Sequence, residues 1–399
     1  MTRMFATLSA SLRRDLFLRE PEHVGPDSPR ELMAHQLGGT LYVRGTQLGL
    51  ARAISREGAR GTTSVVVCME DAIGLHELDA AEANFEAALA TLQRGDTGHL
   101  PMIFARVRRA GHLSRVSRRD SGGLIEGFVL PKFRPEDAES WFAALSDAAS
   151  LRGRRLWVMP VLESVELADP AARGGWLESV KSALAPESDT VLALRVGATD
   201  IAGSLSLRRP AGFTLYDIAP LRDALGAIVG AFASEDSVVP AISGSAYEHF
   251  TPDSRVPDLG LVGGGDRSAR HDATEHARVA GFQAMAAELA LDRAHGLAGK
   301  TAIHPSQVPL INSWQPVTHE DYVDAQAVLA THGATISDYA NKMNEAQPHR
   351  LWALKTLVRS RAAGVLAASV SWRDVFEATR ERGPRASGSS ASRTAGLVR

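Results

Sequence analysis

The chain has 399 residues, of which 44% are hydrophobic and 23% are charged, a composition typical of a soluble globular protein. Its formal net charge of −2 gives no electrostatic case for binding nucleic acid or an acidic membrane. The single cysteine, Cys68, excludes an intrachain disulfide framework and cysteine-based zinc sites. Because no stretch approaches about 18 consecutive apolar residues and the N-terminus lacks a secretory pattern, we expect a cytoplasmic protein without a membrane span.

Residues 1–37 are predicted to form an N-terminal extension with one or two short helices. Within it, Ser28 and Pro29 are typical of an N-cap and a first helical residue. From residue 40 onward, short apolar runs alternate with amphipathic stretches such as 80–92, whose apolar residues fall on one helical face. The apolar runs, interpreted as strands, are eight in number: 40–43, 64–69, 102–107, 127–130, 156–162, 191–196, 238–242 and 300–303.

This alternation predicts an α/β fold, a TIM (β/α)8 barrel over residues 38–335, because such a barrel closes with eight strand-then-helix units. A doubly wound open sheet is the structural rival, but the first run is not followed by the Gly-rich phosphate pattern usual there. The segments 201–216 and 251–271 follow strand ends, so we interpret them as possible lids over the catalytic face. Gly263, Gly264 and Gly265 in the second segment are more typical of a flexible loop than of a phosphate cradle.

The C-terminal part is predicted to add helices to the barrel. Residues 320–331 have a helical pattern, and residues 336–380 are predicted to form a C-terminal helical region that contains one long helix over 336–366. Residues 381–399 are rich in Ser, Arg, Gly and Ala, and we expect a disordered tail there.

Two predicted strands end close to a carboxylate. The run 156–162 is followed directly by Glu163, and the run 191–196 is followed by Gly197, Ala198, Thr199 and Asp200. In a parallel α/β fold the carboxyl ends of the strands meet at one edge, where two acids can converge on a hard cation such as Mg²⁺. The alternative for Glu163 is that it only caps the helix that follows.

Further charged residues lie at other strand ends. Glu70 and Asp71 follow the second run and suit proton transfer or holding metal-bound water, although a single acid there also fits the start of a helix. Arg106, inside the third run, requires a partner, either a substrate oxygen or Glu70 or Asp71. Lys132 after the fourth run adds a second cation, and its use as a Schiff base is unnecessary if a metal is present. His304 after the eighth run is interpreted as a substrate contact or a helix cap.

These motifs together resemble the citrate lyase beta-subunit family, also called the HpcH/HpaI aldolase family, over residues 38 to 335. The two most specific motifs are the paired acids Glu70-Asp71 and the segment from Gly299 to Gln307. The motifs that carry the resemblance are Tyr42-Val43-Arg44-Gly45, Met69-Glu70-Asp71-Ala72-Ile73, Ala105-Arg106-Val107, Leu130-Pro131-Lys132, Leu162-Glu163-Ser164, Gly197-Ala198-Thr199-Asp200 and Gly299-Lys300-Thr301-Ala302-Ile303-His304-Pro305-Ser306-Gln307.

The resemblance implies a TIM barrel that cleaves or forms carbon–carbon bonds in small carboxylates or their CoA thioesters. It implies Mg²⁺, or Mn²⁺, bound by Glu163 and Asp200, and a homo-oligomer of three or six chains. Arg106 would bind the substrate carboxylate and enolate, and Glu70 and Asp71 would lie around the metal's waters. The residues that we predict to contact the substrate are Arg106, Lys132, Gly197, Ala198, Thr199 and His304.

Arg44 and the pair Ser243-Gly244 depart from the pattern of close relatives, which indicates a divergent branch. The sequence therefore predicts a Mg²⁺-dependent carbon–carbon lyase acting on a small oxo- or hydroxy-carboxylate or its CoA thioester through a metal-stabilised enolate, with a water held by Glu70 or Asp71 as proton acceptor. Two alternatives stay open: a metal-dependent acyl-CoA thioester hydrolase on the same barrel, and a non-catalytic assembly subunit.

Overall fold

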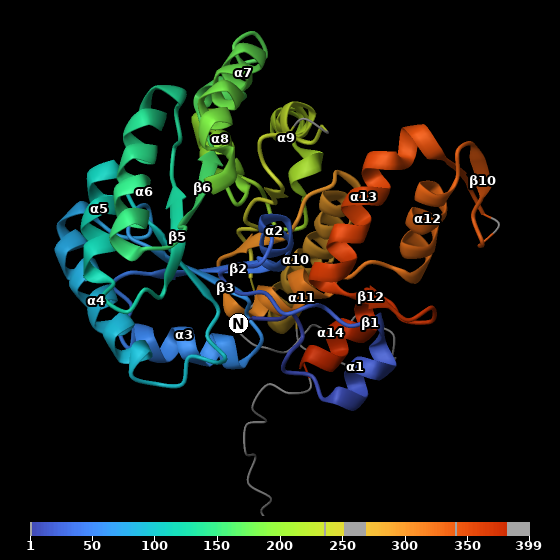
Figure 1. Ribbon diagram of the computed structural model, residues 1–399, viewed down its shortest axis with the longest axis horizontal. Helices are drawn as coiled ribbons and strands as arrows, with labels where there is room; N and C mark the ends of the chain where they lie inside the picture. Colours follow the sequence, from blue (N-terminus) through green and yellow to red (C-terminus); the bar gives the residue numbers. More distant parts are fainter. Residues whose placement is uncertain (1, 235–236, 251–268, 340, 381–399) are drawn as a thin grey trace, which may run out of the picture.

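The computed structural model describes residues 2–234, 237–250, 269–339 and 341–380 (Figure 1). Eight of its strands form one parallel sheet, and their apolar side chains are buried on both faces, as expected of strands covered by helices outside and packed inside a barrel. These strands are β2 Gly39–Arg44, β3 Ser64–Cys68, β4 Met102–Arg106, β5 Ile125–Leu130, β6 Trp157–Leu162, β7 Leu194–Val196, β8 Ile242–Ser243 and β9 Lys300–Ala302.

The sheet closes on itself. Its strand order is β8-β7-β6-β5-β4-β3-β2-β9, and a parallel bridge between Gly244 and Lys300 joins the two ends. The N–H of Gly244 donates to the carbonyl of Gly299 at 3.1 Å, and the N–H of Thr301 donates to the carbonyl of Gly244 at 3.1 Å. The predicted TIM barrel and its eight strands are thus confirmed, although β7 covers only part of the run 191–196 and β8 shares only Ile242 with the run 238–242.

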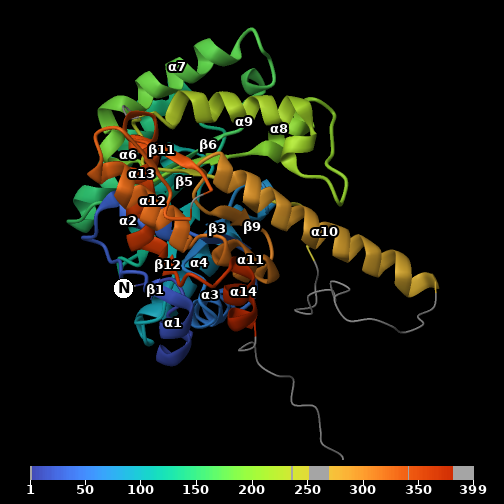
Figure 2. The ribbon, with the colours of Figure 1, turned by 90° about the vertical axis from the view of Figure 1, so that its right-hand side faces the viewer.

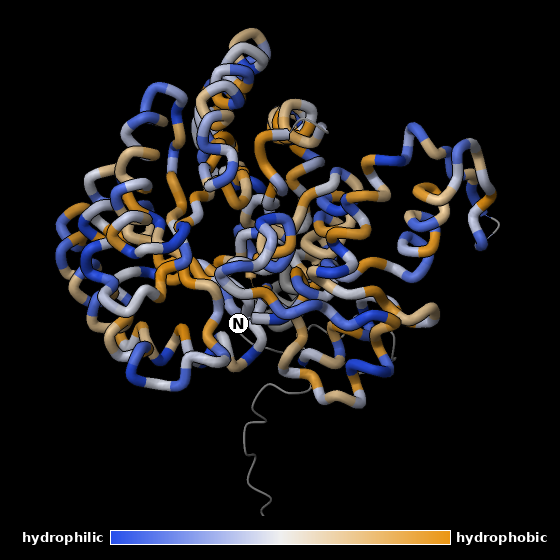
Figure 3. Tube along the Cα trace, in the orientation of Figure 1, coloured by the Kyte–Doolittle hydropathy of each residue, from blue (hydrophilic) through white to orange (hydrophobic). Residues whose placement is uncertain are grey.

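Helices between the strands cover the outside of the barrel. Leu, Val, Ile and Phe side chains of helices and strands share one core, and in Figure 3 hydrophobic and hydrophilic turns alternate along these helices. The predicted helix 80–92 is confirmed as α4, with Phe85 and Leu89 buried. These helices are α3 Leu50–Ala59, α4 Leu78–Gln93, α5 Ala110–Arg119, α6 Ala138–Arg152, α7 Arg173–Leu184, α8 Ala198–Ser204, α9 Ala219–Phe232, α10 Ala269–Ala294 and α11 Val308–Ser313. The long α10 extends away from the barrel in Figure 2.

The N-terminal residues close one end of the barrel. They form α1 Ala10–Leu16, β1 Phe17–Arg19 and α2 Arg30–Gln36. Met33 and Leu37 of this region pack in one cluster with Phe104 and Met159, whose side chains fill the barrel interior. The helix start was predicted one residue early, since Pro29 is the N-cap and the hydroxyl of Ser28 accepts from the N–H of Gly25. The N-terminal residues therefore cover this end of the barrel.

The C-terminal part corrects one prediction. The single helix expected over 336–366 is wrong, because an antiparallel hairpin precedes a shorter helix there. Strand β12 pairs with β1, which holds the two ends of the described chain together (Figure 1). The elements are α12 His319–Ala330, β10 Ala334–Ile336, β11 Met343–Glu345, α13 Ala346–Ala363, β12 Val365–Leu366 and α14 Trp372–Arg380.

Some predictions fall outside the described residues. These concern most of the segment 251–271, including Gly263, Gly264 and Gly265, and the expected disordered tail 381–399. Within the described part, no helix is long and apolar enough to cross a membrane.

Candidate active site at the carboxyl-terminal end of the barrel

Glu70 and Asp71 lie in the turn that follows β3, and an arginine that the sequence reasoning missed holds this turn. The guanidinium of Arg108 donates from Nε to the carbonyl of Met69 at 3.0 Å. It also donates from Nη2 to the carbonyls of Glu70 and Ile73, both at 2.9 Å. Because these backbone acceptors come from one turn, the side chain of Arg108 fixes the position of both acids.

Arg106, the last residue of β4, contacts three carboxylates through its Nη2 atom. The distances are 2.7 Å to Glu70 Oε2, 3.0 Å to Asp71 Oδ2 and 3.2 Å to Glu163 Oε1. Burial opposes the charge, but Tyr42 and the carboxylates outweigh it, so the pKa of Arg106 is raised and the residue stays cationic. The pairing with Glu70 and Asp71, which the sequence left open, is therefore present. Its Nε atom is buried and has no hydrogen-bond partner among the described residues.

Lys132 joins the same group of charges from the end of β5. Its Nζ atom lies 2.8 Å from Glu70 Oε1 and 2.8 Å from Asp71 Oδ1. Partial burial lowers the pKa of Lys132, but hydrogen bonds to Asp71 and Glu70 outweigh it and raise the pKa. The backbone is left-handed at Lys132, with φ 48°, a conformation that costs a non-glycine residue energy and is concentrated at functional sites. This backbone aims the N–H of Lys132 at Glu163 Oε1, 2.7 Å away.

Glu163 follows β6 and is buried at the centre of the cluster, with 1% of its side chain exposed. Burial and the neighbouring Asp200 raise the pKa of Glu163 to about 7, although Arg106 works in the opposite direction. Gly197, at the end of the adjacent strand β7, allows this approach. A Cβ atom at position 197 would lie 2.3 Å from Oε2 of Glu163, so only glycine fits there.

Asp200 lies in the first turn of α8, and its neighbours hold that turn in place. The N–H of Ala198 donates to the hydroxyl of Ser245 at 3.1 Å, and the hydroxyl of Thr199 donates to Glu248 at 3.1 Å. Arg209, from the segment after α8, pairs in turn with Glu248. Ser245, Glu248 and Arg209 carry no signal in the sequence, because their partners are about 40 residues or more away in the chain.

His304 stands apart from the charged cluster. It is the N-cap of the 3₁₀-helix Pro305–Gln307, where its ring accepts from the N–H of Ser306. The ring also stacks on Phe250, with centroids 4.4 Å apart. Of the two roles left open by the sequence, the helix cap is therefore present in the structure.

The two acids Glu163 and Asp200 fit a divalent cation. They follow adjacent strands, and the negative charge of Asp200 contributes to the raised pKa of Glu163, a repulsion that a cation would relieve. In the described part of the chain, no three side chains of His, Cys, Asp or Glu are grouped to hold a metal by themselves. A metal here would take its other ligands from water and substrate, as Mg²⁺ commonly does.

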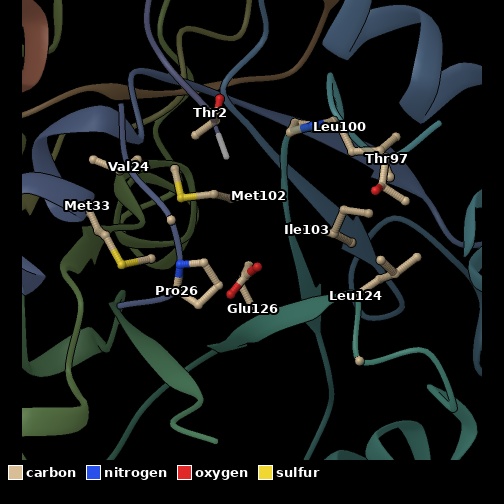
Figure 4. Close-up of a pocket in the computed structure, with 13 residues that line it drawn as sticks. Thr2, Val24, Pro26, Met33, Thr97, Leu100, Met102, Ile103, Leu124 and Glu126 are labelled. Atoms are coloured by element: carbon tan, nitrogen blue, oxygen red, sulfur yellow. The ribbon is translucent and has the colours of Figure 1, made fainter. Parts of the chain in front are cut away.

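A cavity of about 180 Å³ lies at the opposite end of the barrel (Figure 4). Met102 and Ile103 from the start of β4 and Pro26 and Met33 from the N-terminal region line it. Its one acid, Glu126, is paired with Arg154 at 3.0 Å. This cavity therefore lacks the cluster of charged side chains that the carboxyl-terminal end brings together.

Comparisons with known proteins agree with the barrel fold. The family model "C-C bond lyase of the TIM-barrel fold" matches residues 31–365. A search of curated proteins finds no match. The structure is similar to CitE from Mycobacterium tuberculosis in complex with magnesium, acetoacetate and coenzyme A, with TM-score 0.50, 18% identity, and coverage of 83% of this chain and 99% of that chain.

Two further solved structures are similar at lower scores. Malate synthase from Haloferax volcanii, in its magnesium and glyoxylate complex, has TM-score 0.47 and 13% identity, with coverage of 68% of this chain and 72% of that chain. An HpcH/HpaI aldolase/citrate lyase family protein from Burkholderia cenocepacia has TM-score 0.41 and 15% identity, with coverage of 68% and 91%. Because the family model spans most of the chain, the protein belongs to the carbon–carbon bond lyases of the TIM-barrel fold.

Proposed function

We propose that this lyase is Mg²⁺-dependent and acts on a small oxo- or hydroxy-carboxylate, or on its CoA thioester, through an enolate. The observation that carries the proposal is the buried Glu163, whose Oε1 pairs with Arg106 and whose Oε2 lies against Gly197. The charge of Asp200 contributes to the raised pKa of Glu163. The CitE structure, which shares the fold, holds magnesium, acetoacetate and coenzyme A, and this supports a similar ligand class here. Mn²⁺ as an alternative metal and a homotrimer or homohexamer are further parts of the proposal.

Glu163 and Asp200 would hold the metal, and Gly197 leaves Oε2 of Glu163 uncovered by a side chain. When bound, Mg²⁺ would polarise the substrate carbonyl as a Lewis acid and offset negative charge that develops on it. The remaining steps fall to the protein's own side chains and to water.

Arg106 would bind the substrate through the part of its guanidinium that the carboxylates do not use. Its three ion pairs all involve Nη2, whereas the buried Nε–H has no acceptor in the described structure. An oxygen of the substrate carboxylate or enolate would accept this hydrogen bond. A fixed donor of this kind stabilises charge that develops in the transition state.

The cleavage step breaks the bond between the carbons α and β to the carbonyl that becomes the enolate. The β-hydroxyl group loses its proton and becomes a carbonyl, and the electron pair of the broken bond forms the enolate of the second fragment, which then takes a proton from water. Glu70 and Asp71 would hold the water that accepts the hydroxyl proton. Partial burial raises the pKa of Asp71, but its contacts with Glu70, Lys132 and Arg106 outweigh burial and lower it, so Asp71 suits orienting this water better than accepting the proton itself.

The remaining predicted contacts complete the proposed site. Lys132, Gly197, Ala198 and Thr199 would line the substrate, because they lie at the ends of β5 and β7 around Glu163. His304, beside the exposed ring of Phe250, would be an outer contact.

Product analysis tests the proposal. Wild-type protein is incubated with Mg²⁺ and either a 4-hydroxy-2-oxo acid or a 3-hydroxyacyl-CoA thioester. We expect two carbon fragments from one of these substrates, and no turnover by the Glu163→Gln, Asp200→Asn double variant. Arg155→Met, an exposed substitution before β6, serves as the control that retains turnover. Release of free CoA with an intact hydroxy acid would instead identify the thioester hydrolase.

A further inference from the structure

Arg195 is a buried cation without a carboxylate partner. Three Lys and Arg residues in the described part of the chain are buried: Arg195, Arg209 and Lys300. Arg209 pairs with two carboxylates, and Lys300 also pairs with two, at 2.7 and 2.8 Å. Arg195 is 1% exposed, and no carboxylate of the described residues lies within ion-pair distance of it. An unpaired buried charge is costly, so a missing anion is the simplest way to complete this arrangement.

Neutral groups surround the guanidinium of Arg195, among them the sulfur of Met159, 3.8 Å from Nη1. Its Nη2 atom donates to the hydroxyl of Thr301 at 2.6 Å, and Nη1 donates to that of Thr40 at 3.3 Å. The ring of Tyr42 lies 5.5 Å from the guanidinium carbon. These groups satisfy part of the hydrogen bonding but leave the charge uncompensated, and a hydroxyl can itself donate to an anion.

Two donors next to each other lack partners. The Nε atom of Arg195 and the hydroxyl of Ser243 are both buried and have no hydrogen-bond partner among the described residues. Arg195 of β7 and Ser243 of β8 are paired in register on adjacent parallel strands, so both side chains lie on the same face of the sheet. Two adjacent unsatisfied donors and one uncompensated positive charge match the two oxygens of a carboxylate.

This group lies beneath the candidate active site. Arg195 precedes Gly197 by two residues, and Gly197 contacts Glu163. Tyr42 and Thr301, which contact the guanidinium, are both partly exposed. Burial lowers the pKa of Arg195, Tyr42 opposes this effect and Arg106 adds to it, which places the two guanidinium groups within electrostatic reach of each other.

We propose that Arg195, Ser243 and Thr301 form a second carboxylate-binding subsite in the floor of the barrel mouth, and that the substrate is therefore a dicarboxylate. One carboxylate of the substrate would lie at Arg106, and the other would accept from Arg195 Nε and Ser243 Oγ. The inference rests on the proposed function, because it adds a substrate class to that site. A free inorganic anion has the same recognition chemistry, so the test must separate the two sources.

Calorimetry with matched ligands provides the test. Malate and lactate are titrated in chloride-free buffer with Mg²⁺, since lactate lacks only the second carboxyl group of malate. We expect the wild type to bind malate about 10- to 100-fold more tightly than lactate, the effect of one charge-assisted contact. Arg195→Met should remove this preference, Ser243→Ala should reduce it, and the exposed control Arg155→Met should retain it.

Each result has a distinct meaning. Equal binding of malate and lactate to the wild type would overturn the subsite and leave the proposed function standing, and this comparison needs no variant to fold. Binding of neither ligand in the presence of Mg²⁺ would overturn the subsite, and the product analysis described above decides the proposed function separately. A rise in wild-type melting temperature with chloride that is absent in Arg195→Met, together with equal binding of malate and lactate, would assign the site to an inorganic anion and overturn its assignment to substrate.

Discussion

The N–H of Lys132 donates to Oε1 of Glu163 at 2.7 Å from a left-handed backbone with φ 48°. This bond joins the end of β5 to the end of β6 and fixes one oxygen of Glu163. Gly197, at the end of β7, lies against the other oxygen. Residues at the ends of both neighbouring strands, β5 and β7, thus fix the position of Glu163.

Gly197→Ala should displace Glu163, because the added Cβ atom would lie 2.3 Å from Oε2 and 2.4 Å from Cβ of Glu163. Overpacking of this kind costs about 1–3 kcal/mol of unfolding free energy. We expect lower Mg²⁺ affinity together with a reduced melting temperature, measured by calorimetry and thermal unfolding. Gly203→Ala, in the helix α8 that Gly197 precedes, is the matched control, since a Cβ atom there meets nothing within 4 Å. Wild-type Mg²⁺ affinity in Gly197→Ala would contradict the assignment of Glu163 as a ligand.

Arg106 should support both stability and catalysis. Arg106→Met leaves Glu70, Asp71 and Glu163 without their shared cation, and breaking such a buried pair typically costs about 3–5 kcal/mol of unfolding free energy. Arg106→Lys keeps the charge but loses the free Nε–H, so we expect its kcat to fall by about 10²- to 10³-fold. Chemical denaturation and turnover measure these two effects separately. A folded fraction of Arg106→Lys that turns over like the wild type would show that Arg106 is structural only.

Acid should destabilise the protein through His35, in the helix that closes the barrel. Burial, with Arg359 and Lys355 adding to it, lowers the pKa of His35 to about 3. The neutral ring is favoured in the folded state, so the contribution to stability is complete above the unfolded pKa of about 6.5 and is lost as the pH falls toward 3. The unfolding free energy should fall by up to about 1.4 kcal/mol per pH unit in this range.

Denaturant unfolding at a series of pH values measures this slope. His35→Gln should flatten it, while substitution of the exposed His76 by Gln should leave it unchanged. The same slope in His35→Gln and wild type would show that other groups cause the acid sensitivity.

Much of the barrel could be predicted from the sequence because its strands are buried on both faces. Runs such as Ser64–Cys68 and Trp157–Leu162 are apolar at nearly every position, and short runs of this kind are typical of buried parallel strands in an α/β protein. The hairpin β10–β11 was missed because its strands are three residues each and largely exposed, so they lack an apolar pattern. Hydrogen bonding between the two strands, rather than burial, defines that element.

The candidate site could be predicted only where a charged residue lies at the end of a predicted strand. Glu70, Arg106, Lys132 and Glu163 contact one another because parallel strands end at the same edge. Arg195 occurs inside a predicted strand, but the sequence does not show which groups surround its side chain. Its hydrogen-bond acceptors Thr40 and Thr301 are 155 and 106 residues away in the chain. Only the folded barrel brings these groups together.

Calorimetric titration of Mg²⁺ into the wild type and the Glu163→Ala, Asp200→Ala double variant tests the central proposal most directly. We expect one specific Mg²⁺ site in the wild type and none in the double variant, because the two carboxylates would be the protein's ligands. Circular dichroism of the variant confirms that it is folded before the titration. Retention of wild-type Mg²⁺ affinity in the folded double variant would contradict the account.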